Sequence, residues 1–401
     1  MTWRKESFLK VGIIVPYSWS YHGGVIEHAE QQARALRQFG IETRTIIGHD
    51  PHGPLTHLLH VRLGRNGSLP DDIISIGHTV VVPSNGSLAN VIINPAAFFR
   101  LRRILAREDF DLLHLHEPAM PLPCAAALAA ANVPLVGTFH ASGDLPLLGL
   151  AKALYGNLLD RLDVRIAVSQ VARESAERFF PGDYVIIPNG APLPPEVDAG
   201  HRSNRIVFVG RHDPRKGLQV LLRAWPRIRV KTGARLRVVG ADPPAVSRLI
   251  GQLRLTQDGI DLLGPIADEA LTQELLLAKV LVAPSLGNES FGMVLTRAFG
   301  CATPVIASDI PGYRPIVAPD AGRLVAAGDD RLLADSVVDM LADDSKRAAC
   351  GAGARALAES RYSWEQVALR LMAIYRRLLD LPQEEDKKPE APRHEAAAPA
   401  A

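Results

Sequence analysis

Two segments of this sequence place charged side chains where a strand gives way to a helix. In the first segment, Arg211 and Lys216 follow a strand, at a position where cations can neutralise a diphosphate. In the second, Glu289 comes just before a helix, and its carboxylate can accept hydrogen bonds from sugar hydroxyls. Taken alone, the first segment fits a solvated basic loop as well as it fits a diphosphate site. The second fits a carboxylate that only stabilises the helix dipole as well as it fits a sugar site. Free backbone amides at the start of the helix can bind phosphate oxygens, and they belong to Ser290, Phe291, Gly292 and Met293.

Two adjacent glycines, Gly23 and Gly24, lie in the first loop between a strand and a helix. Because they have no side chains, a phosphate or a polar sugar can approach the backbone amides at the positive start of that helix. The alternative is a tight turn that needs a positive φ angle. No strand of the sequence is followed by G-x-G-x-x-G, which argues against an NAD-binding protein.

These segments lie within two series of short apolar strands that alternate with helices. The first series includes the strand 11–15 and the helix 25–39, and the second includes the strand 205–209 and the helix 218–231. This alternation predicts an α/β fold, with two doubly wound, Rossmann-like domains facing each other across a cleft. The predicted divisions are an N-terminal domain (1–190), a linker (191–204), a C-terminal domain (205–363), a helix that returns to the N-terminal domain (364–381) and a disordered tail (382–401).

The composition is that of a globular protein and restricts the choice of partners. The chain has 401 residues, of which 47% are apolar and 22% charged, and its net charge is +2. Such a small net charge produces no overall field toward nucleic acid, so we expect no nucleic-acid partner. Cys124, Cys301 and Cys350 are widely spaced and lack zinc-site spacing, which favours reduced thiols and a cytoplasmic location.

Nine segments in a fixed order link these features to a known family. Over nearly the whole chain up to the tail, they resemble the family-4 retaining glycosyltransferases of the GT-B fold. Within that family they resemble the actinobacterial phosphatidylinositol mannosyltransferases. The segments are VPYSWSYHGGVIEH, PSNGSLA, DFDLLHLHEP, GTFHAS, IAVSQ, IPNGA, VGRHDPRKGL, PSLGNESFGMVL and PVIASDIPGYR.

The resemblance implies a nucleotide-sugar donor, GDP-mannose or a UDP-hexose, held mainly by the C-terminal domain. Arg211 and Lys216 would bind the diphosphate of this donor, and Glu289 would bind its hexose. The amides of Ser290–Met293 would bind the phosphates. The N-terminal domain would then hold the acceptor.

The resemblance also implies how the reaction proceeds. Gly23 and Gly24 would approach the donor as the domains close, and His140 would contact the sugar near its reacting carbon. The hexosyl group would move with retained anomeric configuration and without a protein nucleophile. The departing phosphate would take the acceptor proton on the same face. The protein would contribute positioning and charge stabilisation, with no divalent metal or other cofactor.

Two further pairs of residues have the types of side chain that bind metals. Asp109 and Asp111 have the spacing of a metal motif from the other glycosyltransferase fold, but they open a strand rather than close one. His114 and His116 share one face of that strand. We interpret these histidines as structural or acceptor-side residues and not as metal ligands.

The sequence departs from the family pattern at Arg297, where the family signature has a second glutamate eight residues after Glu289. That glutamate would accept hydrogen bonds from both ribose hydroxyls, whereas arginine can only donate them. One interpretation is a weakened or altered donor site. The other is that Arg297 turns away and packs at the helix surface, with water holding the ribose.

A second departure concerns the acceptor. The phosphoinositide enzymes carry two arginines that would meet a lipid phosphate, and this sequence has Asn90 and Ile92 at those positions. Phosphatidylinositol is therefore not assigned as the acceptor. Tyr17, Asn85 and Ser87 remain available, so a cyclitol or sugar head group can still be expected to dock there.

A basic helix at about 98–107 adds a candidate membrane surface. Its apolar residues follow one helical stripe, while most of its arginines follow another. In the resembling enzymes this helix contacts the membrane, and the alternative is an ordinary helix with a solvated basic face. The candidate membrane-surface residues are Arg100, Arg102, Arg103 and Arg107.

Three functions follow as hypotheses. The first is a glycosyltransferase that acts on a lipid-linked or cyclitol acceptor, in the cytoplasm or peripherally at the inner face of the plasma membrane. The second, motivated by Arg297, is a catalytically weak protein of the same fold that binds sugar nucleotides or lipids. The third is a sugar-nucleotide epimerase, which product analysis without an acceptor would distinguish.

Overall fold

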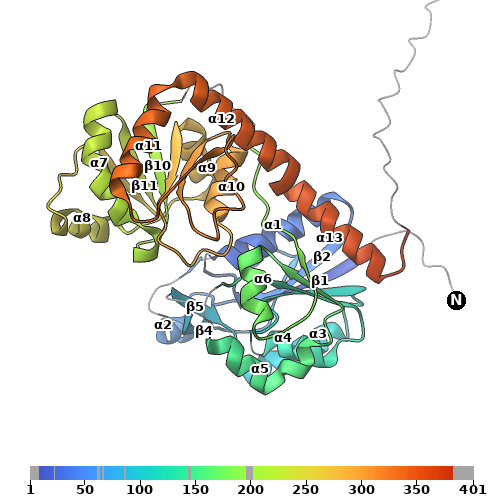
Figure 1. The fold of residues 1–401 in the computed structure, drawn as a ribbon. Helices are drawn as coiled ribbons and strands as arrows, with labels where there is room; N and C mark the ends of the chain where they lie inside the picture. Colours follow the sequence, from blue (N-terminus) through green and yellow to red (C-terminus); the bar gives the residue numbers. More distant parts are fainter. Residues whose placement is uncertain are drawn as a thin grey trace, which may run out of the picture.

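The computed structural model describes residues 9–21, 23–60, 64–65, 67–84, 87–120, 122–142, 146–195 and 202–382. Within them the chain forms two α/β lobes, each built around a sheet whose strands are mostly parallel (Figure 1). The predicted α/β class with two parallel sheets is therefore confirmed. The tail predicted from residue 382 onward lies, apart from that residue, outside the described part of the chain.

The first lobe is built on a sheet centred on β1 (Lys10–Ser18). Its central parallel strands are buried apolar runs, as expected where helices cover both faces. An antiparallel hairpin, β4 (Val80–Ser84) and β5 (Ser87–Val91), joins β1 through the pairing of Tyr17 with Val91 and was not predicted. In spatial order the parallel strands are β3 (Ile73–Ser75), β2 (Glu42–Gly48), β1, β6 (Leu112–His116), β7 (Leu135–Phe139), β8 (Val164–Ala167) and β9 (Tyr184–Ile186).

Helix α1 (Gly24–Gln38) packs on the first sheet and carries part of the candidate site at its start. Its buried residues recur at helical spacing, as in Ala29, Ala33 and Leu36. The helix ends before Gly40, whose φ of 79° reverses the chain toward β2. The other helices of the lobe are α2 (Pro54–Leu59), α3 (Pro95–Leu105), α4 (Pro123–Ala130), α5 (Pro146–Leu159) and α6 (Gln170–Glu177).

The second lobe has a six-stranded parallel sheet. Its spatial order is β12 (Ile260–Gly264), β11 (Arg235–Val239), β10 (Arg205–Val209), β13 (Val280–Ala283), β14 (Val305–Ser308) and β15 (Gly322–Val325). The order reverses direction between β10 and β13, which is where ligands bind in open α/β sheets. The helices are α7 (Leu218–Thr232), α8 (Pro243–Gln252), α9 (Asp268–Leu277), α10 (Met293–Gly300), α11 (Asp330–Ala342) and α12 (Asp344–Leu357).

The last described helix, α13 (Trp364–Leu378), returns to the first lobe and lies beside α1 (Figure 1). A π-helical turn, Ala358–Tyr362, joins it to α12. The hydroxyl of Tyr375 lies 2.5 Å from Nδ1 of His114, so the chain end is bonded to the centre of the first sheet. Gly190 leaves room for this return, because a Cβ atom there would lie 2.2 Å from Cδ2 of Trp364.

Candidate active site at the junction of the two lobes

The site in the second lobe is built where the loop after β10 meets the loop after β13. The backbone amide of Leu286 donates to the carbonyl of Arg215 at 2.7 Å, which ties the two loops together. Gly217 makes this approach possible, because its φ is 69° and a Cβ atom would lie 1.8 Å from the carbonyl oxygen of Pro284. The contact brings Lys216 and Glu289 together, with Nζ 2.6 Å from Oε1.

The carboxylate oxygen of Glu289 that contacts Lys216 also accepts from a hydroxyl group, and a second hydroxyl group supports the first. Ser285 donates to Oε1 of Glu289 at 3.2 Å, and the Ser285 hydroxyl lies 2.8 Å from that of Tyr313. Burial, together with the nearby Glu289 charge, raises the pKa of Tyr313, so this phenol stays protonated. The Glu289 carboxylate is therefore fixed in place and still partly accessible, with its side chain 13% exposed.

The cations of this loop have different surroundings. Arg215 is bound to Asp213, with Nη2 2.6 Å from Oδ2, and the hydrogen bonds from Arg215 lower the pKa of Asp213. Lys216 is the cation that reaches Glu289, while Arg211 lies exposed at the rim of the loop. Of the two cations predicted to bind a diphosphate, the structure therefore places one beside the predicted sugar-binding carboxylate and one nearer to solvent.

The start of α10 corrects one prediction. The sequence predicted a helix directly after Glu289, with free amides from Ser290 onward, but the helix begins at Met293. Gly292 precedes it with a φ of 82°, and a Cβ atom there would lie 2.6 Å from Cε1 of Tyr313. Phe291 is buried, with its ring 5.9 Å from that of Tyr362, because a large aromatic side chain is more stable in the core than in the site. The amides of the first helical turn therefore start at Met293.

The first turns of α1 and α10 face each other across the junction between the lobes. Gly23 and Gly24 are exposed at the start of α1, and a Cβ atom on Gly24 would lie 3.4 Å from Sδ of Met293. Ser169, which caps α6, also donates its hydroxyl to the backbone carbonyl of Ser290. Two helix starts with positive ends thus meet at one place, where they can act together on an anion.

Arg297 lies one turn further along α10 and bridges the lobes. Its Nη1 lies 3.2 Å from Oε1 of Glu27 on α1 and 3.3 Å from Oδ1 of Asp268 on α9. Its Nη2 donates to the backbone carbonyl of Asp268 at 3.3 Å. The Arg297 side chain is only 12% exposed and lies between Glu27 and Asp268, and whether it weakens the donor site stays a prediction.

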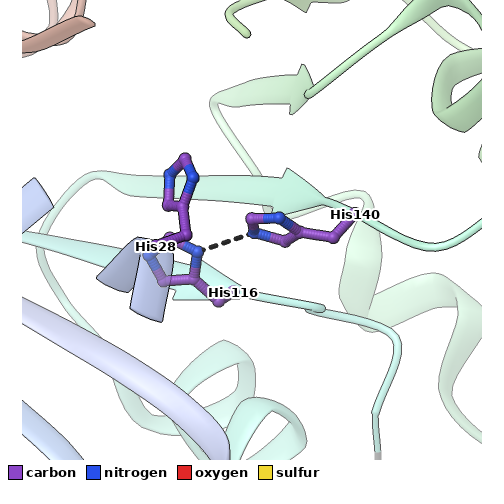
Figure 2. A group of neighbouring side chains, drawn as sticks. All are labelled: His28, His116 and His140. Carbon is purple, nitrogen blue, oxygen red and sulfur yellow. Dashed lines mark hydrogen bonds between the residues drawn. The ribbon is translucent and has the colours of Figure 1, made fainter. Parts of the chain in front are cut away.

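A cluster of histidines lies in the first lobe, close to the start of α1. Figure 2 shows His28 of α1 beside His116 at the end of β6 and His140 just after β7. Nδ1 of His116 is hydrogen-bonded to Nε2 of His140 at 2.9 Å, and His28 lies edge-on to His140 with ring centroids 4.8 Å apart. Burial lowers the pKa of His28 to about 4 and lowers those of His116 and His140, so these rings are neutral near pH 7.

The same three histidines have a spacing that a metal ion could use. One ring nitrogen from each lies within 4.8 Å of the others. However, the nitrogens of His28 already lie 2.6 Å from Oδ1 of Asn189 and 3.1 Å from Oε1 of Gln32. These contacts fit a hydrogen-bonded network that orients His140. The structural role of His116 stays a prediction.

Glu117 is a site residue that the sequence analysis did not identify. Its carboxylate is buried and accepts hydrogen bonds from the backbone amides of His140, at 2.9 Å, and Ala141, at 2.7 Å. Burial raises its pKa to about 7, although these hydrogen bonds act in the opposite direction. Its φ of 50° is unusual for a side-chain-bearing residue. The available signal was a carboxylate directly after an apolar strand, at the sheet edge where ligands bind.

His28 and Glu27 were also missed, and the reason is similar. Both lie in the first turns of α1, where the sequence analysis considered only the glycines. His28 occupies the buried face of the helix, and a polar residue on such a face signals a hydrogen-bonded network. For Glu27 the sequence contains no comparable signal, because its partner Arg297 is 270 residues away.

The predicted acceptor residues are only partly described. Asn85 lies outside the described residues, as does the side chain of Ser87. Tyr17 is partly buried at the end of β1, and burial, followed by the nearby Glu117 charge, raises its pKa. Asn90 lies 3.1 Å from Nδ1 of His60, and Ile92 is fully buried in the core. Neither position therefore provides the cation that a lipid phosphate would need.

The basic helix α3 presents its arginines to solvent. Leu101 is buried against the first lobe, whereas Phe99 is 66% exposed beside the arginines. The helix ends at Leu105, so Arg107 follows it rather than belonging to it. Among the described residues, no helix has both the length and the apolar character needed to span a bilayer. The exposed arginines are Arg100, Arg102, Arg103 and Arg107.

The remaining candidates are accounted for by local structure. Asp111 accepts a hydrogen bond from the backbone amide of Lys10 at 2.8 Å, at the amino end of β6. Asp109 and Asp111 therefore lie at the edge of the sheet opposite His116 and Glu117. Cys124, Cys301 and Cys350 are all buried free thiols.

Comparisons with known proteins define the class. Residues 22–194 match the family described as Glycosyltransferase Family 4, and residues 203–343 match Glycosyl transferases group 1. A glycosyltransferase from Rickettsia africae ESF-5 superposes with a TM-score of 0.69 at 19% identity, over 94% of this chain and 99% of that chain. Anabaena Alr3699/HepE in complex with UDP-glucose superposes with a TM-score of 0.66 at 19% identity, over 91% and 98%. The chain belongs to the family-4 glycosyltransferases and has the predicted GT-B fold.

Within this family, the chain is similar to the phosphatidyl-myo-inositol mannosyltransferases. It is 35% identical over 378 residues to that of Mycobacterium leprae, covering 92% of this chain and 96% of the relative. It is 35% identical over 383 residues to that of Mycolicibacterium smegmatis, covering 92% and 93%. A D-inositol 3-phosphate glycosyltransferase from Xylanimonas cellulosilytica is 29% identical over 307 residues, covering 66% and 72%. The protein is therefore a glycosyltransferase with mannosyltransferase relatives, which confirms the resemblance stated from the motifs.

Proposed function

We propose that this protein transfers a mannosyl group from GDP-mannose to a hydroxyl of an inositol-type or other cyclitol head group, with retention of the anomeric configuration. The observation that carries the proposal is the pairing of Lys216 with Glu289 in the loops just before α10, whose first residue, Met293, approaches Gly24 of the other lobe. A cation and a carboxylate at one helix start suit the two halves of a nucleotide sugar, because one attracts phosphate and the other accepts from hydroxyls.

The donor diphosphate is assigned to Lys216, Arg211 and the amides from Met293 onward. These groups are positive, and they lie where negative charge grows as the bond from the sugar to the diphosphate breaks. The sugar hydroxyls are assigned to Glu289, which Ser285 holds in position. Exchange of the Lys216–Glu289 contact for contacts with the donor would release both groups for binding.

The chemical step needs no protein nucleophile in this proposal. The bond from the anomeric carbon to the diphosphate oxygen breaks, and the acceptor oxygen bonds to that carbon on the same face. The acceptor proton passes to the departing phosphate oxygen. His140 is a neutral ring fixed by His116, so it can hydrogen-bond the sugar without adding charge. The cations and helix amides supply the charge stabilisation for which other enzymes use a divalent ion.

The acceptor is assigned by hydroxyl chemistry rather than by phosphate binding. The curated relatives are named for transfer to phosphatidyl-myo-inositol and to D-inositol 3-phosphate. Asn90 and Ile92 provide no cation for a phosphate, but Tyr17 remains at the end of β1. We therefore place the acceptor ring near Tyr17 and the lipid, where present, toward the exposed basic side of α3. We further propose action at the cytoplasmic face of the membrane, whose anionic lipids attract basic surfaces such as that of α3.

The alternative of a catalytically weak binding protein is less well supported. It depended on Arg297 facing the donor with the wrong charge. Arg297 is instead paired with Glu27 and Asp268, so the charge reversal leaves no uncompensated cation at this place.

The experiment that tests the proposal is a product assay with purified full-length protein. GDP-mannose, UDP-glucose and UDP-N-acetylglucosamine are each incubated with myo-inositol, inositol phosphate or phosphatidylinositol vesicles, and the products are identified by mass spectrometry and by NMR of the anomeric proton. An α-linked mannosylated product from GDP-mannose is expected. Binding of a nucleotide sugar without turnover on any acceptor would support the alternative, and a changed sugar nucleotide without acceptor would indicate an epimerase.

A further inference from the structure

Arg297, Glu27 and Asp268 form a group of three that contains two carboxylates and one guanidinium. Arg297 lies between two carboxylates, with Nη1 3.2 Å from Oε1 of Glu27 and 3.3 Å from Oδ1 of Asp268. One guanidinium neutralises one carboxylate, so the group of three keeps a net negative charge of about one unit. Asp268 also binds Nη2 of Arg297 through its backbone carbonyl. Arg297 therefore makes two hydrogen bonds to Asp268 of its own lobe, and its Nη1 is shared between Asp268 and Glu27.

Glu27 has unused capacity to accept hydrogen bonds. A carboxylate has about four lone-pair positions, and Arg297 occupies one oxygen of Glu27. Among the described residues, Glu27 makes no second side-chain hydrogen bond. Its side chain is 38% exposed, whereas that of Arg297 is 12% exposed, so a ligand can reach Glu27 while Arg297 lies behind it. Burial raises the pKa of Glu27, and the Arg297 charge partly opposes this rise.

The position of Glu27 relative to the phosphate site follows from helix geometry. Gly24 and Met293 mark the point where α1 and α10 approach each other. Glu27 is three residues beyond Gly24 and Arg297 is four residues beyond Met293, which is about 4.5 Å and 6 Å along the respective helix axes. In a nucleoside diphosphate, one ester oxygen and one methylene separate the α-phosphate from the ribose ring. A donor whose phosphates lie at the start of α10, and whose nucleoside extends along that helix, would bring its ribose to the level of Glu27 and Arg297.

We propose that Glu27, held by Arg297, accepts the hydrogen bonds of the donor ribose hydroxyls, so that the ribose-binding carboxylate comes from the lobe opposite the phosphate site. This inference rests on the proposed function, because it needs a nucleotide donor. It gives the positive charge of Arg297 a role. Arg297 cannot accept a hydrogen bond from a hydroxyl, but it holds the Glu27 carboxylate, which can accept one. It also makes ribose binding depend on contact between the lobes, because Glu27 is on α1 and the phosphate groups are on α10.

The test is isothermal titration calorimetry with GDP and 2′-deoxy-GDP on the full-length protein. We expect the wild type to bind GDP about tenfold more tightly than 2′-deoxy-GDP, which is the size of one charge-assisted hydrogen bond. Glu27→Gln should weaken GDP about tenfold and weaken 2′-deoxy-GDP less, because that ligand keeps only the 3′-hydroxyl, so the discrimination should decrease. The matched control is Glu30→Gln, one turn further along α1, where the carboxylate pairs with Arg65 instead. This control should keep the wild-type preference.

A double variant with the two charges exchanged provides a second, independent test of the same proposal. Glu27→Arg combined with Arg297→Glu keeps the ion pair but moves the carboxylate to α10, so it should restore GDP binding relative to Glu27→Arg alone. Each variant is first checked for an unchanged melting temperature. If GDP binds but Glu27→Gln keeps the full ribose discrimination, this inference is overturned while the proposed function stands. If GDP does not bind the wild type, the proposed donor itself is wrong.

Discussion

Lys216 and Glu289 are 73 residues apart in the chain, yet Nζ of the lysine lies 2.6 Å from Oε1 of the glutamate. The two residues that sequence analysis assigned to different parts of the donor are therefore partners in this structure. Each is partly exposed, with side-chain exposures of 29% and 13%, so a ligand can reach both. A donor that binds here must replace this contact with its own phosphate and hydroxyl groups.

The first prediction concerns Lys216. Lys216→Ala should lower kcat by about 10²- to 10³-fold, because the departing diphosphate loses a preorganised cation. Lys216→Arg should recover part of the rate, since the charge is retained. Lys279→Ala, at a lysine that lies 3.9 Å from Asp344, is the control and should leave the rate unchanged. Steady-state kinetics with the identified donor measures the effect, and equal rates for Lys216→Ala and the control would contradict it.

The second prediction concerns Glu117 and the pH dependence of stability. Burial raises its pKa in the folded protein to about 7, so the folded state binds a proton that the unfolded state has already released above its ordinary pKa of 4.5. This contribution to stability is present below pH 4.5 and is lost as the pH rises through about 7. Each pKa unit of difference corresponds to about 1.4 kcal/mol of unfolding free energy.

Glu117→Gln should remove this dependence, because the amide oxygen can still accept from His140 and Ala141 but cannot ionise. Urea unfolding of both proteins between pH 4.5 and pH 8 provides the measurement. The unfolding free energy of the variant should increase relative to that of the wild type across this range. The buried histidines, whose pKa values are lowered, act in the opposite direction in both proteins and cancel in the difference. Parallel curves would show that Glu117 does not titrate as expected.

The third prediction concerns Gly190 at the return of the chain. A Cβ atom there would lie 2.2 Å from Cδ2 of Trp364, so Gly190→Ala should lower the unfolding free energy by about 1–3 kcal/mol. Gly251→Ala is the matched control, because a Cβ atom at this position in α8 meets no other atom within 4 Å. Alanine should make that helix more stable by roughly 0.5–1 kcal/mol. Thermal unfolding of the two variants should therefore shift in opposite directions.

The fourth prediction concerns the basic surface of α3. In vesicles with anionic lipid, each arginine near the surface contributes about 1 kcal/mol, so four together amount to a hundredfold or more in affinity. We expect the wild type to sediment with anionic vesicles at low salt and to be released at high salt. The variant replaces Arg100, Arg102, Arg103 and Arg107 with glutamine and should lose this binding.

The control for this experiment carries the same change in charge on the second lobe. It replaces four exposed arginines, Arg223, Arg248, Arg254 and Arg331, with glutamine. If net charge alone determined vesicle binding, both variants would lose it equally. Retention by the control and loss by the α3 variant would assign binding to that face. Equal sedimentation of both variants with the wild type would rule out a membrane role for α3.

Local sequence patterns predicted most of the strands and helices that carry the site. Apolar runs and helical periodicity are properties of neighbouring residues, so β1, α1, β10 and α7 could be predicted within a few residues of their observed bounds. The hairpin of β4 and β5 was missed, because its strands are short and one contains a proline. The start of α10 was misplaced because Gly292 has a positive φ, which is not helical, and lies against the ring of Tyr313. Neither feature can be predicted from the neighbouring residues in the chain.

Residue types and motifs were enough to identify side chains that could serve the donor: the cation Lys216, the carboxylate Glu289 and the exchange of a glutamate for Arg297. Their chemistry is a property of each residue type and its neighbours along the chain. The folded molecule was needed to find that Lys216 contacts Glu289, that Glu117 fixes the backbone at His140, and that Arg297 reaches Glu27 on the opposite lobe. Contacts between residues tens to hundreds of positions apart depend on how the sheets and lobes pack, and that packing is set by the burial of the whole apolar core rather than by any local pattern.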